Sequence, residues 1–532
     1  MKKIILFLAL LCAQYTYGQL VTGENIAVTS TNSGKVRGYI FNGIYTYKGI
    51  PYAEANRFEA PHAPASWDGV RSSMTYGPVA PLLDPTTRVQ DESEFVFDHD
   101  WGYTSEDCMR LNIWTKAIND GKKRPVMFWI HGGGYTAGSS QELPSYDGEN
   151  LARKGDVVVV SINHRLNVLG YLDLSVFGEK YKHSANISIL DIKAALEWVQ
   201  QNIANFGGDP GNVTIFGQSG GGAKVNTLMA MPSAKGLFHK AINQSGAFRG
   251  TMLEKETTQA ITAEVLKELN ITASSIDDIQ KVPFTALSEA SKKALKIVAD
   301  QLKAAGKPVT GFGLSWGPSV DGVDLPYQMF APEALELSKN VPLLIGTVKN
   351  EFMPSLGAGL SNAPLDKVIE FIQKQNGDKS DAFIKAVKKA YPHDIKPSDL
   401  IDVDTRFRPG AVYEANLKSN LTGGAPVYMY LFDWQSPVMD GKYKAIHCSE
   451  LAFCFNNIQR TKNMCGGGAK AQVLADKVSQ AWINFARKGN PAHAALPAWP
   501  AYNEKNTATM HFDNSCSLKP QLDKELFELV AQ

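Results

Sequence analysis

Ser219 is the residue of this chain whose surroundings most clearly predict covalent chemistry. It stands in the run GQSGG at 217–221, which matches the pattern G-x-S-x-G, and the apolar residues 213–216 precede it. Glycines on both sides of a serine allow the tight strand-to-helix turn that holds the hydroxyl above the end of a sheet. We therefore expect Ser219 to act as a nucleophile.

A second match to the same pattern, GLSWG at 313–317, places Ser315 in different surroundings. Pro318 follows it at once and is typical of a turn, whereas residues 223–231 after Ser219 are rich in helix-forming types. A nucleophile motif of this kind needs a strand before it and a helix after it. We therefore expect Ser315 to have no catalytic role.

A serine hydroxyl is a weak nucleophile at neutral pH, so a histidine must take its proton and a carboxylate must orient that histidine. Glu351 is the expected acid, because it follows the apolar stretch 342–345 by a short connection. Asp321 is the alternative. Its pairing with Gly322 is typical of a turn in which the aspartate bonds its own backbone, and we therefore favour Glu351.

The histidine must follow the acid if the chain obeys the order serine, acid, histidine that α/β-hydrolases use. That order leaves His393, His447, His493 and His511. His447 ends the loop that leaves the apolar strand at 427–432, so the sheet would deliver it toward the nucleophile, and we expect it to be the base. His393 and His493 lie close to prolines and are expected to be surface groups.

A glycine-rich loop, HGGGY at 131–135, directly follows the apolar run 126–130. Backbone N–H groups of such a loop can approach a substrate oxygen without interference from side chains, and acyl transfer needs donors of this kind. No Gly-Lys-Ser/Thr follows, so the loop does not have the pattern of a phosphate site. His131 is expected to form structural hydrogen bonds only.

The elements that must position these residues form an α/β pattern. Continuous apolar runs at 126–130 and 157–162 are typical of strands buried on both faces, and residues 189–206 have helical spacing. This order predicts a mostly parallel sheet whose site lies at the carboxyl ends of its strands. Alternation over 34–52 predicts antiparallel strands at the N-terminal edge. Helical insertions that cover the sheet end are expected at 251–310 and 360–420.

The whole chain has the composition of an ordinary globular protein, with 532 residues of which 44% are hydrophobic and 20% charged. Residues 1–18, with two early lysines and an apolar core, are expected to be a signal peptide, so that a secreted or periplasmic product results. One domain over 19–532 is expected. A net charge of +1 without a basic cluster argues against nucleic-acid binding, and no later run is long enough to span a bilayer.

Five cysteines follow residue 18: Cys108, Cys448, Cys454, Cys465 and Cys516. The odd number leaves at least one thiol unpaired or bridged to another molecule. None combines with histidines at zinc-site spacing, so we predict no metal site, and no cofactor is expected. The cysteines are expected to be small buried hydrophobes with at most one disulfide.

Taken together, these motifs resemble the type-B carboxylesterase family, the cholinesterase-like branch of the α/β-hydrolases. Further matches cover nearly the whole mature chain: YKGIPYA at 47–53, SEDCMRLN at 105–112 and NFGGDP at 205–210. The resemblance implies a triad of Ser219, Glu351 and His447. It also implies that Ser245 supports the acid and that the oxyanion donors come from Gly133, Gly134 and Gly220.

Three positions depart from the family's pattern. Ala80 stands where the family has the disulfide partner of the cysteine at Cys108. Gln218 replaces a common glutamate, which predicts poor use of choline esters if this residue faces the alcohol pocket. Phe352 replaces the usual glycine after the acid and is expected to narrow the site.

The implied function is hydrolysis of small-molecule carboxylic esters through an acyl-enzyme at Ser219. Amide hydrolysis by the same residues is one alternative. A non-catalytic, cholinesterase-like binding domain is the other, because fold alone does not fix function. The nucleophile, acid, base and oxyanion glycines together favour an enzyme.

Overall fold

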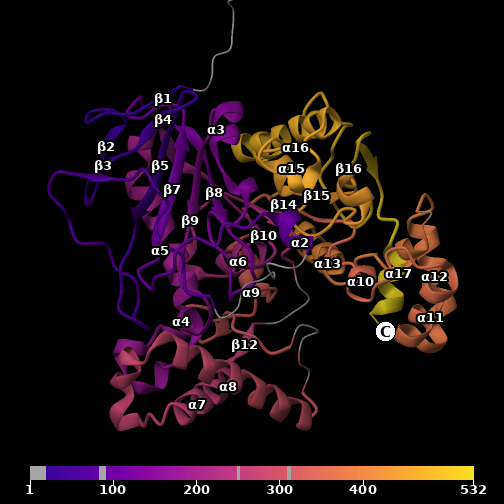
Figure 1. The fold of residues 1–532 in the computed structure, drawn as a ribbon, viewed down its shortest axis with the longest axis horizontal. Helices are drawn as coiled ribbons and strands as arrows, with labels where there is room; N and C mark the ends of the chain where they lie inside the picture. The colour runs from indigo at the N-terminus through magenta and orange to yellow at the C-terminus, as the bar shows by residue number, and fades with distance from the viewer. Residues whose placement is uncertain are drawn as a thin grey trace, which may run out of the picture.

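A computed structural model describes residues 19–82, 92–247, 252–307, 309, 313–394 and 396–531. Residues 1–18, the predicted signal peptide, lie outside the described residues. The dominant element is a sheet in which twelve strands of the described chain take part (Figure 1). In spatial order they are β1 (Leu20–Val21), β4 (Tyr39–Phe41), β5 (Ile44–Pro51), β7 (Arg110–Thr115), β9 (Val158–Ile162), β8 (Arg124–Ile130), β10 (Gly208–Gln218), β11 (Lys240–Gln244), β14 (Leu343–Val348), β15 (Val427–Phe432), β16 (Thr509–Phe512) and β17 (Ser517–Lys519).

The sheet is parallel in its centre and antiparallel at its edges. Neighbouring strands from β9 to β16 run parallel. Those from β1 to β9 pair antiparallel, as do β16 and β17. The antiparallel N-terminal edge is as predicted, except that part of the alternating segment, β3 (Gly34–Arg37), leaves the main sheet. It pairs instead with β2 (Val28–Thr31) and β6 (Val70–Ser72) in a separate sheet.

Both faces of the central strands are covered, which explains their unbroken apolar runs. Alternate residues of a strand point to opposite faces. In β8, Phe128 and Ile130 therefore join one core cluster, which includes residues of helix α5 (Ile187–Asn202). Met127 and Trp129 join a second cluster with residues of α16 (Ala469–Lys488). A strand between two helical layers needs apolar side chains at every position.

The two predicted helical insertions are present. The first contains α7 (Lys255–Glu268) and α8 (Phe284–Ala304), which lie side by side at the lower edge in Figure 1. The second contains α11 (Leu365–Asn376), α12 (Ser380–Ala390) and α13 (Phe407–Ser419). Helix α13 packs against β14 and β15, close to the carboxyl edge of the sheet.

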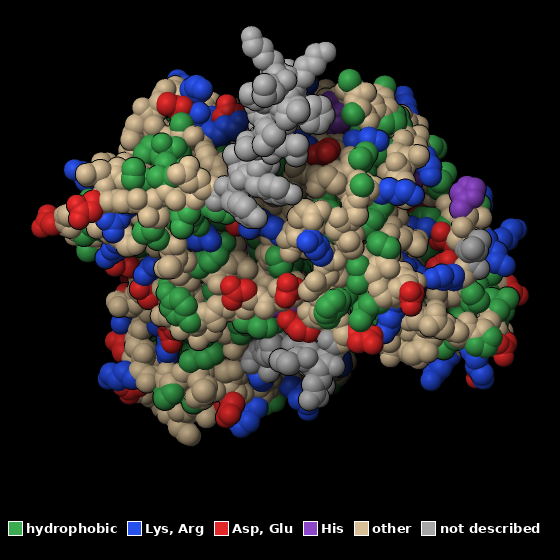
Figure 2. Space-filling model, turned by 45° about the horizontal axis from the view of Figure 1, so that its top comes forward, with side chains coloured by type: hydrophobic (Ala, Val, Ile, Leu, Met, Phe, Trp, Pro, Cys, Tyr) green, Lys and Arg blue, Asp and Glu red, His purple; other side chains and the backbone are tan. Residues whose placement is uncertain are grey.

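Cationic and anionic side chains are interspersed over the face of the molecule shown in Figure 2, without a large area of one sign. None of the helices in the described ranges combines the length and the apolar character that crossing a bilayer requires.

Candidate active site

Ser219 lies at the turn between β10 and helix α6 (Gly220–Met229), and its backbone has a positive φ of 55° with ψ −125°, which is unfavourable for any residue except glycine. The Ser219 N–H donates to the carbonyl of Gln244 on β11 at 2.8 Å. A side chain at Gly221 would place its Cβ 2.0 Å from the Ile130 carbonyl oxygen. The turn therefore needs glycine beside the serine, as the motif predicts.

The glycine loop after β8 lies directly against this turn. Gly133 and Gly134 adopt φ values of 78° and 62°, which glycine alone adopts without strain. A Cβ on Gly220 would lie 2.1 Å from the Gly134 carbonyl oxygen, so the two backbones are in contact. The loop and the first N–H of α6 thus lie together beside Ser219, as backbone donors to a developing oxyanion must.

Glu351 and His447 are brought together across the ends of β14 and β15. Nδ1 of His447 is hydrogen-bonded to Oε2 of Glu351, and the His447 backbone N–H donates to the Glu351 carbonyl at 3.1 Å. The hydroxyl of Ser245, at the end of β11, donates to Oε1 of Glu351 at 2.6 Å. The Val348 N–H donates to the same oxygen at 3.1 Å. These two bonds fix the carboxyl group that contacts the ring.

Burial dominates the electrostatics of this pair. It lowers the pKa of His447 from 6.5 to about 4, against the opposing influence of the Glu450 and Asp404 carboxyls. It also raises the pKa of Glu351 to about 8, although the bonds from Ser245 and Val348 favour the carboxylate. A low-dielectric site disfavours charge on either group. The environment therefore favours the neutral imidazole, which is the form that can accept a proton.

Gln218 is fully buried and contacts His447. Its Nε2 lies 3.2 Å from Nε2 and 3.4 Å from Nδ1 of His447. The thiol of Cys448 donates to Gln218 Oε1 at 3.2 Å. The amide of Gln218 therefore faces the His447 ring on one side and the Cys448 thiol on the other. Within the described chain, Ser219 and His447 form no direct hydrogen bond.

Two aromatic rings lie against His447. Phe352 stacks on the imidazole with ring centroids 4.5 Å apart, and the ring of Phe407, at the start of α13, lies 5.2 Å away. Phe407 is buried, whereas Phe352 is 54% exposed. Phe352 thus presents an apolar surface beside His447, and its narrowing of the site stays a prediction.

The residues that were alternatives to the predicted triad, and His131, lie in turns, loops or structural hydrogen bonds. Oδ1 of Asp321 accepts hydrogen bonds from the backbone N–H groups of residues 323, 324 and 325, as expected of a turn aspartate. Ser315 is exposed in a loop, and His393 is exposed after α12. His511 pairs with Asp433 at 2.6 Å, and His131 bonds the Gly132 carbonyl through Nδ1 at 3.0 Å.

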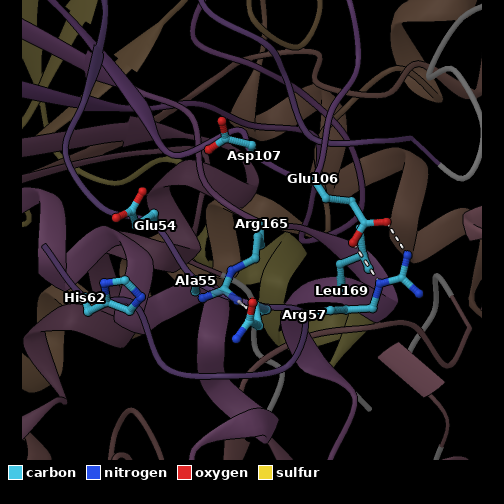
Figure 3. Close-up of a pocket in the computed structure, with 9 residues that line it drawn as sticks. Glu54, Ala55, Arg57, His62, Glu106, Asp107, Arg165 and Leu169 are labelled. Atoms are coloured by element: carbon cyan, nitrogen blue, oxygen red, sulfur yellow. Dashed lines mark hydrogen bonds and ion pairs between the residues drawn. The ribbon is translucent and has the colours of Figure 1, made fainter. Parts of the chain in front are cut away.

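A cavity of about 440 Å³ is lined by residues other than those of the proposed triad (Figure 3). Its wall carries the ion pair of Arg57 with Glu106, and Arg165, which pairs with the buried Asp191. These charges are already paired, so the cavity has the character of a structural ion-pair cluster. No set of three or more His, Cys, Asp or Glu side chains in the described ranges could hold a metal ion.

All five cysteines of the described chain are free thiols, so they form none of the disulfides that the sequence would permit. Cys108 is buried in a small cluster with Ala80 and Leu166. The alanine at the predicted partner position thus packs against the thiol that it cannot bridge. Of the residues around His447, sequence reasoning missed Cys448, Phe407 and Asp404, and the only signal for Cys448 was its place next to the base.

Comparisons with known proteins identify the family. The model of the carboxylesterase family matches residues 25–529. The chain is 36% identical over 517 residues to the para-nitrobenzyl esterase of Bacillus subtilis, covering 94% of this chain and 97% of that protein. It is 32% identical over 523 residues to the cocaine esterase of Homo sapiens, covering 90% of this chain and 86% of that protein.

Solved structures show the same fold. An esterase from anaerobic Clostridium hathewayi that can hydrolyse aliphatic aromatic polyesters superposes with a TM-score of 0.80 at 38% identity, covering 96% of this chain and 99% of that one. A carboxylesterase of Geobacillus stearothermophilus gives a TM-score of 0.75 at 36% identity, covering 94% and 99%. The predicted α/β-hydrolase fold is confirmed. The chain belongs to the carboxylesterase family and is a carboxylic ester hydrolase of that family.

Proposed function

We propose that Ser219, His447 and Glu351 form the catalytic triad through which this enzyme hydrolyses its esters. Ser219 Oγ attacks the carbonyl carbon while His447 takes its proton, and the backbone N–H groups of Gly133, Gly134 and Gly220 stabilise the oxyanion. His447 then protonates the departing alcohol. Water, activated by the same histidine, hydrolyses the acyl-enzyme and restores the serine.

The hydrogen bond between His447 and Glu351, whose carboxyl group also accepts from the Ser245 hydroxyl, is the observation that carries this proposal. A buried carboxylate with a dedicated donor, paired with a histidine beside the nucleophile turn, has the geometry that orients a base. A structural histidine–glutamate contact alone would not need a glycine loop and a strained serine next to it.

The exposed ring of Phe352 supports a preference for esters with an apolar or aryl group next to the scissile bond. Relatives whose names indicate aryl-containing substrates, the para-nitrobenzyl esterase and the polyester-hydrolysing esterase, point the same way. Amide bonds are chemically accessible to the same residues, and we propose that they are the weaker substrates.

Hydrolysis of p-nitrophenyl esters by the purified protein tests the assignment. Ser219→Ala should abolish turnover above the uncatalysed rate while the thermal unfolding midpoint stays near that of the wild type. Ser315→Ala is the matched control, because it removes a serine from the other copy of the motif, and it should retain near-normal activity. The reverse pattern would overturn the choice of nucleophile. The rates of hydrolysis of the corresponding p-nitroanilides measure how much weaker amides are as substrates.

We also propose that residues 1–18 direct export. The basic start, apolar core and small residues before Gln19 support this. Expression of the full chain followed by N-terminal sequencing of the protein from periplasm and medium should give a chain that begins at Gln19. Uncleaved protein confined to the cytoplasm would contradict the proposal.

A further inference from the structure

The amide of Gln218 lies over the face of the His447 ring. Its nitrogen is nearly equidistant from the two ring nitrogens, at 3.2 and 3.4 Å. Those nitrogens are separated by one carbon, so a donor at these distances lies above the ring and not along either lone pair. The Nε2 lone pair therefore remains available to the Ser219 hydroxyl.

The orientation of this amide is set from its other end. The Cys448 thiol donates to Gln218 Oε1 at 3.2 Å, which leaves the amino group facing the ring. Burial and the nearby Glu450, Glu142 and Glu351 carboxyls raise the pKa of the Cys448 thiol well above its usual value, so it is a neutral donor. Cys448 holds a left-handed φ of 74°, a conformation that strains any residue except glycine.

We propose that Gln218 is a positioning residue, oriented by the Cys448 thiol, that presents the positive end of its amide dipole to His447 and so keeps the catalytic base neutral. The inference rests on the triad proposed above. An N–H donor over an aromatic face is attracted to a neutral ring and is repelled by an imidazolium. A glutamate at this position would have the opposite effect.

The other groups that face His447 are carboxyls. Glu351 contacts Nδ1, while Glu450 and Asp404 act from the following turn and from the segment before α13. Each favours the imidazolium when ionised. The amide of Gln218 is therefore the polar group at the ring that opposes them, together with the burial that Phe352 and Phe407 provide.

The acid limb of the profile of kcat/KM against pH measures this effect, because it reports proton loss from the base in the free enzyme. Gln218→Met removes the amide at similar volume and should move the limb upward by about half a pH unit, as expected for an interaction of this class. Gln218→Glu should move it further in the same direction. Cys448→Ala should move the acid limb upward by part of the shift seen in Gln218→Met. Cys448→Ser should keep the limb at its wild-type pH, because a serine hydroxyl can also donate to Gln218 Oε1.

A double mutant tests whether the thiol acts through the amide. In the Gln218→Met background, Cys448→Ala should cause no further shift. Cys465→Ala is the matched control, since it truncates a buried thiol that bonds only its own segment, and its limb should coincide with that of the wild type.

An unmoved limb in an active Gln218→Met enzyme would overturn the proposal, as would independent shifts from the two positions. If Gln218→Met does not fold, the test is the comparison of Cys448→Ala with Cys448→Ser. Acid limbs at the same pH in those two variants would also overturn the proposal. Failure of the triad itself would appear differently, as activity that survives Ser219→Ala.

Discussion

Glu351 illustrates how much of the site depends on single carboxylate oxygens. One oxygen contacts His447 and the other accepts from Ser245 and from the Val348 backbone, so each has a defined role. Removing the charge while keeping the shape isolates the electrostatic part of that role.

Glu351→Gln is expected to lower kcat by a factor on the order of 10⁴, because the amide can neither select the correct tautomer nor stabilise the imidazolium. The rate of p-nitrophenyl ester hydrolysis measures this loss. Asp321→Asn serves as the control, since its Oδ1 can still accept the three turn hydrogen bonds. A larger loss in Asp321→Asn would show that the acid is misassigned.

The wild-type acid limb should lie below pH 6.5, since burial lowers the pKa of His447 to about 4. The sign follows from the role of the base: activity is lost as pH falls through this pKa, because the protonated ring cannot accept the Ser219 proton. Phe352→Ala hydrates the ring that Phe352 now covers and should move the limb toward 6.5. A limb that moves downward would contradict a desolvating role for this ring.

The sequence predicts which residues should carry the chemistry, but it does not predict how their neighbours pack. Ser219, Glu351 and His447 follow from motif and chain order, and the structure brings Glu351 and His447 into contact. The contact of Gln218 with Cys448 joins residues 230 positions apart. No local pattern encodes such a side-chain contact, which depends on the packing of β10 against the segment after β15.

At the scale of elements, the turn from β10 into α6 is the most constrained part of the site. The glycines after Ser219 each lie where a side chain would meet backbone or a buried amide: Gly220, Gly221 and Gly222. Close packing of helix against strand, and not flexibility, is therefore what this glycine run provides.

Gly221→Ala should destabilise the protein by about 1–3 kcal/mol, the usual cost of overpacking, and should greatly reduce activity because the clash with the Ile130 carbonyl displaces the turn. Thermal unfolding and ester hydrolysis measure the two effects. Gly357→Ala in helix α10 (Pro354–Gly357) is the control, since its Cβ would meet no atom within 4 Å. Equal behaviour of the two variants would refute the packing argument.

Long apolar elements were predicted with nearly the bounds observed, because burial on both faces leaves a continuous signal. Strand β11 was missed, since its sequence KAINQ is short and half polar. Its polar end serves the site: Gln244 accepts the Ser219 N–H, and Ser245 follows at once. The polar residues that serve the site interrupt the apolar run by which this strand could have been predicted.

At the scale of the whole molecule, the fold is held without covalent cross-links among the described residues. Thiol titration under denaturing, non-reducing conditions should therefore find five reactive cysteines in the chain 19–532. Native protein should react more slowly, because Cys108, Cys454 and Cys465 are buried. A denatured count of three would reveal a disulfide and contradict the structure.

Four residues of the site, Ser219, Ser245, Glu351 and Cys448, hold left-handed backbones with φ between 42° and 74°. A positive φ lowers the free energy of unfolding by about 1–2 kcal/mol at each residue other than glycine. Glycine would avoid this cost, but part of the gain is offset because glycine loses more conformational entropy on folding. Heat resistance and turnover therefore compete for the same positions. At Ser219, the proposed nucleophile, a laboratory evolution screen that scores only survival of heating would enrich glycine and yield hardier, inactive protein, so residual activity must be the selected trait.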